Sequence, residues 1–357
     1  MKTSNGSVRT AHSVLWALLT ALVLSACGSP YRGAVTDHFD GKLFFTPGAS
    51  KSSSPAGYLW RRLTNPPPEW PQAVPAKANL PALVQRVSGN EARVTYIGHA
   101  TLLIQVAGLN ILTDPVWSQR ASAVQWLGPK RVAQPAWRFE QLPPIDVVLI
   151  SHNHYDHLDV PTLRLLDSAH RPRVVAPLGL QKLLAKTMPQ SKVSEHDWGD
   201  RVSLAQGAWV HVEPMAHGSG RTPFDQMQTL WAAYVLEAAG IKIYHVGDAG
   251  YAGGKFFRSI ASRHGVLDLA ILPIGAYEPV DFMADSHMSP SEAVQALIDT
   301  GARQGLAHHF DTFQLGFEAF GAAESELVNA KKARNLSTQK MIVPKLGEAL
   351  IIQATMQ

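Results

Sequence analysis

The chain has little cysteine, little charge and no long apolar run. Cys27 is its only cysteine among 357 residues, which excludes an intramolecular disulfide. The formal net charge of +4 at pH 7 is too weak to indicate a nucleic-acid partner. The longest apolar stretch, VLWALLTALVLSA, is shorter than the roughly 20 residues that span a membrane. What is present is 46% hydrophobic residues, enough for a large core and compatible with an oligomer.

The first 26 residues have the pattern of an export leader. The opening segment, MKTSNGSVRTAHS, carries basic but no acidic residues, and the apolar stretch over 14–26 follows it. The ending LSAC resembles the bacterial lipobox, in which the cysteine is lipidated and becomes the mature N-terminus. We therefore expect 1–26 to be a lipoprotein signal peptide and Cys27 to bind the membrane of the cell envelope. Gly28 favours the outer membrane in a cell that has two. A plain signal peptide or an uncleaved anchor is the alternative.

Residues 27–90 have the composition of a tether and a lead-in segment. The stretch before residue 57 is rich in Gly, Ser and Pro, and TNPPPEWPQAVPAKANLP is rich in Pro. Neither stretch holds a sustained helical or strand period. Several aromatic residues indicate that parts of the segment wrap over the main domain: Phe39, Phe44, Phe45, Trp60 and Trp70.

The region 91–357 has the pattern of one αβ domain. Strands are expected over 92–98, 101–108, 109–115, 146–151, 173–177, 209–215, 229–248 (two strands), 267–275, 304–310 and 347–352. Helices are expected over 160–169, 178–187, 255–265, 289–302 and 316–333. Strand meanders followed by αβ alternation occur twice, which predicts an αββα sandwich of two mixed β-sheets with helices outside.

Ionisable residues are concentrated directly after the predicted strand over 146–151. The segment ISHNHYDHLD contains His152, His154, Asp156 and His157. In an extended chain, residues two apart point the same way, so His152 and His154 can converge on one ion. Imidazoles and carboxylates are ligands that suit zinc. A lone histidine is usually a surface or satisfied core group, but four such residues at one strand end indicate a metal site.

Further ligands are expected at the ends of other strands. His217 follows VHVEPMA, Asp248 follows IYHVG and His309 follows GLAH, and each precedes a Gly-rich or polar loop. Taken alone each is a weak candidate, and His308 competes with His309. Their shared position after an apolar run strengthens all of them.

These motifs resemble those of a known family. SHNHYDHLD resembles the H-x-H-x-D-H signature of the metallo-β-lactamase superfamily. Other segments are similar to the branch that contains N-acyl-phosphatidylethanolamine-hydrolysing phospholipase D and its bacterial relatives: YIGHATLLIQVAGLNILTDPVWSQRAS, WLGPKR, VGDAGY, LAILPIGAYEP, HMSPSEAV and HHFDTF. The similarity covers roughly residues 92–351 in matching order and implies the αββα fold of that superfamily.

The resemblance implies a binuclear zinc site with two ions per chain. Its ligands would be His152, His154 and His217 for one ion, Asp156, His157 and His309 for the other, and Asp248 as the bridge. The alignment of AHHFDTF selects His309, with His308 on the opposite face of the strand.

The resemblance also implies a reaction. Two metals about 3.5–4 Å apart can hold a bridging hydroxide that attacks phosphorus in line, with Asp156 orienting or deprotonating it. A phospholipid or small phosphodiester is the expected substrate. β-Lactam hydrolysis is disfavoured, because that branch usually places a cysteine in the second metal site and Cys27 is the only cysteine here. A lactonase or esterase on the same site, or a non-catalytic envelope lipoprotein, are the alternatives.

Other residues match family positions near the site. His287 matches a histidine close to the substrate, and its imidazole could bind a phosphate oxygen or a carbonyl, or only mark a helix entry. His99 and Asp114 are expected to orient ligands or to be structural. Further residues are candidates for the cleft wall: Tyr251, Tyr277 and Glu278.

Overall fold

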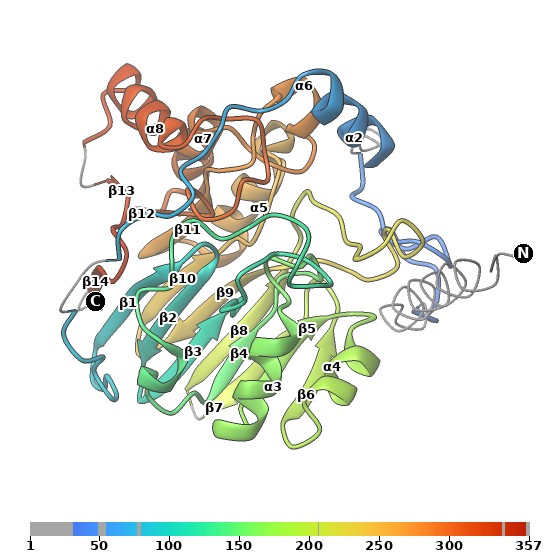
Figure 1. Ribbon diagram of the computed structural model, residues 1–357. Coiled ribbons are helices and arrows are strands. Elements are labelled where there is room, and N and C mark those ends of the chain that lie inside the picture. Colours follow the sequence, from blue (N-terminus) through green and yellow to red (C-terminus); the bar gives the residue numbers. More distant parts are fainter. Residues whose placement is uncertain (1–30, 49–54, 77–79, 206, 338–339, 355–357) are drawn as a thin grey trace, which may run out of the picture.

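The computed structural model describes residues 31–48, 55–76, 80–205, 207–337 and 340–354 (Figure 1). The predicted signal peptide over 1–26 and Cys27 lie outside the described residues. Within the described part of the chain, no helix combines the length and the apolar character that crossing a membrane requires.

The first of two mixed sheets contains the N-terminal meander of the domain. Its strands β14, β1, β2 and β3 pair antiparallel, and β3, β4, β5 and β6 pair parallel. In sheet order they are β14 (Ala349–Gln353), β1 (Glu91–Gly98), β2 (Thr101–Val106), β3 (Leu109–Thr113), β4 (Val147–Leu149), β5 (Arg173–Pro177) and β6 (Lys192–His196).

The second sheet repeats this arrangement along the chain, with antiparallel strands first and parallel strands after them. Strands β7 to β10 pair antiparallel, and β10 to β13 pair parallel. In sheet order they are β13 (Met341–Ile342), β12 (Gln304–His308), β11 (Leu269–Pro273), β10 (Ile241–His245), β9 (Ala233–Ala238), β8 (Ala208–Glu213) and β7 (Arg201–Ala205).

Helices cover the outer faces of both sheets, and the predicted αββα sandwich is confirmed (Figure 1). Apolar side chains of both sheets, such as Val94 and Val210, form the core between them. Leu163 packs under the first sheet, while Phe257 and Leu297 pack under the second. The helices are α2 (Pro55–Thr64), α3 (Val160–Ala169), α4 (Gln181–Thr187), α5 (Lys255–His264), α6 (Val280–Met283), α7 (Pro290–Thr300) and α8 (Ala322–Ala333), with 3₁₀ turns η1 (Phe139–Gln141) and η2 (Ala252–Gly254).

The start of α7 shows how the sequence defines a helix beside the site. The Ser289 hydroxyl accepts a hydrogen bond from the Glu292 amide at 3.3 Å, and the Glu292 carboxylate accepts one from the Ser289 amide at 2.8 Å. This reciprocal capping box, with Pro290 in the first turn, fixes the helix start. His287 is therefore held two residues before a defined helix.

Several elements differ from the sequence-based expectation. The segment 27–90 contains the unpredicted helix α2, and Phe39 and Phe44 are buried against the second sheet's core while Trp60 is 68% exposed. Strands β6, β7 and β13 were not predicted either. Each lies at the edge of its sheet, and β6 and β7 carry charged, partly exposed side chains, so they lack a clear apolar period.

Candidate metal centre

Three histidines from two sheets form the first half of the site. His152 and His154 follow β4, and His217 follows β8. His152 Nε2 lies 2.8 Å from His154 Nδ1 and 3.1 Å from His217 Nε2. His154 Nδ1 and His217 Nε2 are 3.3 Å apart. Nitrogens bound tetrahedrally at about 2.0–2.1 Å from one zinc ion lie about 3.3 Å apart. The spacing therefore fits three ligands of a single ion.

Asp156, His157 and His309 form the second half. Asp156 Oδ2 lies 3.3 Å from His157 Nε2 and 3.1 Å from His309 Nε2. His99 Nε2 donates to the same oxygen at 2.9 Å, so His99 lies within this group rather than behind it. The four side chains are buried and their polar atoms lie within 4.8 Å of one another, with His99 as a hydrogen-bond donor that positions Asp156.

Asp248, after β10, lies between the two halves. Its Oδ2 is 3.1 Å from His157 Nε2 and 3.8 Å from His217 Nε2, and its Oδ1 is 3.1 Å from His309 Nε2. The side chain is 2% exposed. A carboxylate that reaches nitrogens of both groups has the position of a bridging ligand. The structure thus brings all seven predicted ligands together.

The hydrogen bonds of the histidines show that the donor set fits a metal. His157 Nδ1 donates to Asp114 Oδ2 at 2.8 Å, and His217 Nδ1 donates to the Ser286 carbonyl at 2.8 Å. Each Nε2 then points a lone pair into the cluster, and the buried His157 Nε2 has no hydrogen-bond partner among the described residues. An outer partner on one nitrogen and a free lone pair on the other is the arrangement of metal-binding histidine.

Most of the charge states suit cations. Burial raises the pKa of Asp156 and Asp248, but the neighbouring histidines together, His157 foremost, outweigh it, so both pKa values lie well below the usual range. Despite burial, the surrounding carboxylates raise the pKa of His157 and His309, that of His309 to about 9, so a metal bound there would displace protons from these two rings. Burial and adjacent imidazoles lower the pKa of His152 well below its usual value. Burial also lowers the pKa of His217 well below that value, despite the opposing carboxylate of Asp248. Ionised carboxylates and neutral imidazoles are the forms that bind metals.

His309 and its neighbour His308 have different environments. His309 has φ of +61°, a left-handed conformation that is strained for a residue with a Cβ, and its ring faces the cluster. His308 Nε2 instead donates to the Val246 carbonyl at 2.7 Å. The structure therefore places His309, and not His308, among the candidate ligands.

A cavity of about 380 Å³ opens onto the cluster. It is lined by His154, Asp156, Asp248, His287, Tyr155, Arg221, Met283 and Leu315, among others. A larger cavity of about 1000 Å³, here called the groove, shares part of this wall and adds Arg62, Trp70, Lys130 and Gln314. A side pocket of about 330 Å³ is lined by Gln125, Tyr155, Arg164, Lys186 and Arg221.

The cleft wall differs from expectation. The hydroxyls of Tyr251 and Tyr277 donate to Asp299 and Glu326, at 2.7 and 2.6 Å, and neither they nor Glu278 are among the described residues that line this cavity. That part of the prediction is wrong. Arg221 was missed. Its guanidinium lies 3.8 Å from the centre of the Tyr155 ring and donates to two backbone carbonyls. The only feature of the sequence that could have indicated Arg221 as a site residue is its position four residues after His217.

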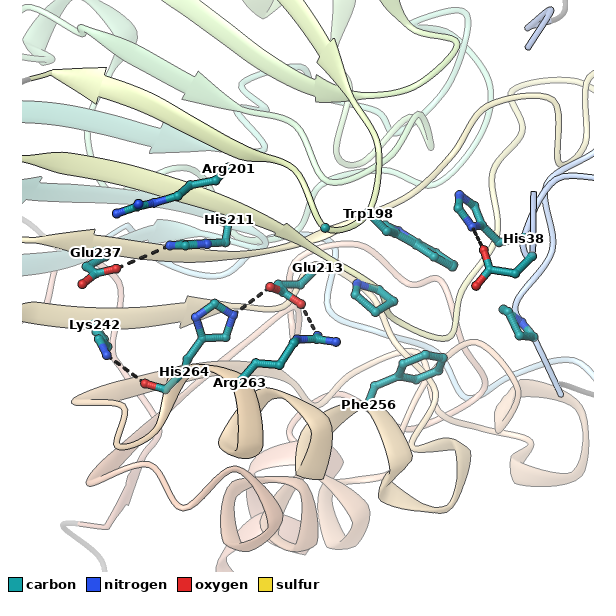
Figure 2. A pocket seen from close by; sticks show the side chains of 14 residues that line it. His38, Trp198, Arg201, His211, Glu213, Glu237, Lys242, Phe256, Arg263 and His264 are labelled. Atoms are coloured by element: carbon teal, nitrogen blue, oxygen red, sulfur yellow. Dashed lines mark hydrogen bonds and ion pairs between the residues drawn. The ribbon is translucent and has the colours of Figure 1, made fainter. Parts of the chain in front are cut away.

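A second cavity of about 770 Å³ lies elsewhere, between the outer face of β7–β10 and α5 (Figure 2). Its charged groups pair with one another: Glu213 with His264 at 2.7 Å and with Arg263, and Glu237 with His211 at 3.4 Å. Within the described ranges, the groups that could hold a metal are confined to the first site. This second cavity therefore adds no ligands to it.

Comparisons with known proteins agree with this geometry. The Beta-lactamase superfamily domain matches residues 109–310, more than half of the chain, so the chain belongs to this superfamily. With the buried His/Asp cluster, it is a metal-dependent hydrolase of that superfamily.

Individual relatives are similar over much of the chain. An uncharacterised protein of Mycobacterium tuberculosis is 35% identical over 269 residues, which cover 74% of this chain and 70% of the relative. N-acyl-phosphatidylethanolamine-hydrolyzing phospholipase D 1 of Caenorhabditis elegans is 33% identical over 231 residues, covering 62% of this chain and 64% of the nematode protein. The isothiocyanate hydrolase from Delia radicum gut bacteria has the same fold, with a TM-score of 0.59 at 19% identity over 74% of this chain and 100% of that one.

Proposed function

We propose that the protein is a binuclear zinc hydrolase of phosphodiesters that acts on phospholipid in the manner of phospholipase D. The observation that carries this proposal is the joining of seven ligand-type side chains into two groups that share Asp248. The resemblance to the nematode phospholipase supports a lipid phosphodiester as the substrate.

The ligand sets are those that the resemblance implies, and the distances are compatible with them. His152, His154 and His217 would hold one zinc ion, Asp156, His157 and His309 the other, with Asp248 between them. When bound, such a pair supplies Lewis acidity, which activates water at neutral pH and withdraws charge from a phosphoryl oxygen.

Two side chains are proposed to act on the reacting groups. Asp156, fixed by His99 and lining the cavity, orients the attacking water and accepts its proton. Burial lowers the pKa of His287 to about 4, so its imidazole is neutral at pH 7 and can donate a hydrogen bond to a phosphoryl oxygen. In the reaction, a water oxygen bonds to phosphorus, the P–O bond to the headgroup alcohol breaks, and that alcohol leaves with a proton.

The walls of the site suit a lipid with a phosphate. Met283 and Leu315 line both the metal cavity and the groove, and they provide apolar surface beside the ligands. Trp70 adds an aromatic wall, while Arg62 and Lys130 add positive charge. Acyl chains and a phosphate group would meet matching surfaces there.

The location is proposed to be the cell envelope. The LSAC ending predicts that Cys27 is lipidated and holds the protein to a membrane. A phospholipid-hydrolysing site held at a membrane would meet its substrate at high local concentration.

One assay tests the activity. The zinc-loaded protein is tested on bis-p-nitrophenyl phosphate, a panel of lactones and N-acyl-phosphatidylethanolamine, with His309→Ala as the inactive control. Hydrolysis of both phosphodiesters is expected. Turnover of lactones alone would replace the proposal with a lactonase, and no turnover of any substrate would contradict it.

A further inference from the structure

Six large exposed apolar side chains lie on segments that also line the metal cavity, the groove or the side pocket. Their exposed fractions run from 45% for Val280 to 73% for Phe224. We call this set the rim: Trp60, Leu63, Trp126, Leu127, Phe224 and Val280. A cluster of exposed apolar groups around a site marks a surface that contacts something other than water.

Five of the rim residues are tied to the cavities by nearby residues in sequence, and Val280 by Met283, three residues along α6. Arg62, between Trp60 and Leu63 on α2, lines the groove. Trp126 and Leu127 connect Gln125, in the side pocket, to Gly128, in the groove. Pro223, just before Phe224, lines the metal cavity. Separate segments of the chain therefore carry exposed apolar side chains close in sequence to residues that line adjoining openings.

The helix that carries Trp60 and Leu63 is held in place. Arg61 donates two hydrogen bonds to Asp281, at 3.0 and 2.6 Å, and its guanidinium lies 5.5 Å from the centre of the Phe282 ring. These contacts fasten α2 to α6, and the two helices lie side by side in Figure 1. The exposure of Trp60 and Leu63 is thus a feature of a helix that contacts the rest of the domain.

The cavity walls beside the rim residues are mainly positively charged, and the exposed carboxylate of Asp281, next to Val280, is paired with Arg61. The groove and the side pocket are lined by Arg62, Lys130, Arg164, Lys186 and Arg221. The acidic residue in these walls, Asp159, is 4% exposed and accepts hydrogen bonds from Ser118 and Thr162. Cations on an apolar margin complement the negative surface of a membrane that contains anionic lipids.

We infer that the rim is a docking surface for an anionic phospholipid bilayer, which it contacts with the metal cavity facing the lipid. The inference rests on the proposed function, because a lipid hydrolase needs its opening at the bilayer. Tryptophan at two rim positions suits the membrane interface, where an apolar ring and a polar N–H are both accommodated. The chain outside the structure, with its apolar stretch and Cys27, ends just before Tyr31 and would reach the same bilayer.

Site-directed labelling tests the contact. Full-length protein is reconstituted into phosphatidylcholine vesicles with and without phosphatidylglycerol, carrying a fluorophore at Leu63→Cys, Trp126→Cys or Phe224→Cys. Ile351→Cys on β14, where Ile351 is 47% exposed on a strand distant from α2 in Figure 1, is the matched control. The parent chain, whose only cysteine is Cys27, gives the labelling background.

Rim labels should be quenched several-fold more by spin-labelled lipids than the Ile351→Cys label, and more strongly when phosphatidylglycerol is present. Equal, weak quenching at all positions would overturn the inference and leave a protein that is tethered but not docked. Equal quenching with and without phosphatidylglycerol would overturn the anionic part of it.

Activity separates this inference from the proposed function. Trp126→Asp with Phe224→Asp should lower hydrolysis of vesicle-borne N-acyl-phosphatidylethanolamine several-fold and leave hydrolysis of bis-p-nitrophenyl phosphate unchanged, whereas Ile351→Asp should change neither. An equal loss on both substrates would contradict docking. If the parent protein hydrolyses neither substrate while its rim labels are still quenched, the hydrolase proposal fails and docking stands.

Discussion

The hydroxyl of Ser151, the residue before the candidate ligand His152, donates to Asp114 Oδ2 at 2.6 Å. The same hydroxyl lies 2.9 Å from His152 Nδ1, while Asp114 also accepts from His157 Nδ1 at 2.8 Å. Because the Ser151 proton goes to Asp114, His152 Nδ1 is the donor to Ser151. One carboxylate therefore fixes the tautomer of a ligand in each half of the site.

Asp114→Asn should weaken zinc binding in both halves by about 10- to 100-fold, the usual effect of removing an outer partner of a metal ligand. Competition with a chromophoric chelator measures it. Asp167→Asn is the control, because Asp167 is a buried carboxylate that accepts from Gln190 and Ser191. A loss of affinity in the control alone would show that Asp114 has no special connection to the ligands.

Asp248→Ala should abolish turnover and reduce the zinc content. The parent protein is expected to hold close to two zinc equivalents, and the variant fewer, because the removed carboxylate lies near His217 of the first half and His309 of the second. Metal analysis after zinc reconstitution measures both. A parent protein that binds no zinc, or a variant that keeps full zinc and full activity, would be incompatible with a shared bridge.

His309→Ala should lower zinc affinity and activity far more than His308→Ala. His309 faces the cluster, whereas His308 bonds to the Val246 carbonyl and can affect only packing. Thermal unfolding and zinc titration of both variants separate the two effects. The reverse order would show that the neighbouring histidine is the ligand.

Gly275→Ala should disturb the centre from a distance. A Cβ at Gly275 would lie 2.0 Å from the His309 carbonyl oxygen, so the backbone that presents His309 must move. Gly305→Ala is the matched control on β12, because its Cβ would meet the flexible Leu297 side chain. Both variants should lose stability by about 1–3 kcal/mol, but only Gly275→Ala should also lose zinc affinity. Denaturant unfolding and zinc titration measure the two quantities.

Cys27→Ser should give an unanchored or uncleaved protein with an intact metal centre. Its activity on bilayer substrate should fall, because an acyl anchor contributes about 0.8 kcal/mol for each buried methylene. Activity on a soluble phosphodiester should be unchanged. Cell fractionation checks the location, and a cleaved variant that stays in the membrane fraction through a high-salt wash would rule out the lipid anchor.

Much of the fold and of the candidate site could be predicted because apolar runs end where ligands begin. The runs before His152, His217 and Asp248 form β4, β8 and β10, and their side chains meet as expected. The approach of His99 to Asp156 depends on how the turn between β1 and β2 packs against the loop after β4, which no local period encodes. Arg221 lies in an irregular loop, so no periodic pattern in the sequence predicts its position beside the site.

The edges of the molecule were harder to predict for a related reason. β6 and β7 pair on one side only, so charged residues are tolerated and the alternating pattern is lost. The helix α2 contacts the rest of the domain through residues such as Arg61, which pairs with Asp281, 220 residues away in sequence. Contacts between residues so far apart produce no local sequence pattern from which they could be predicted.

The ligands of the centre come from both layers of the sandwich. His152 extends from β4 of the first sheet, while His217, Asp248 and His309 extend from β8, β10 and β12 of the second. A metal pair held by this set would cross-link the two sheets, since the sheets could not separate without releasing it. Separation of the two layers would then cost the binding free energy of the metal, so the loaded protein would resist opening of the sandwich more than the metal-free protein does.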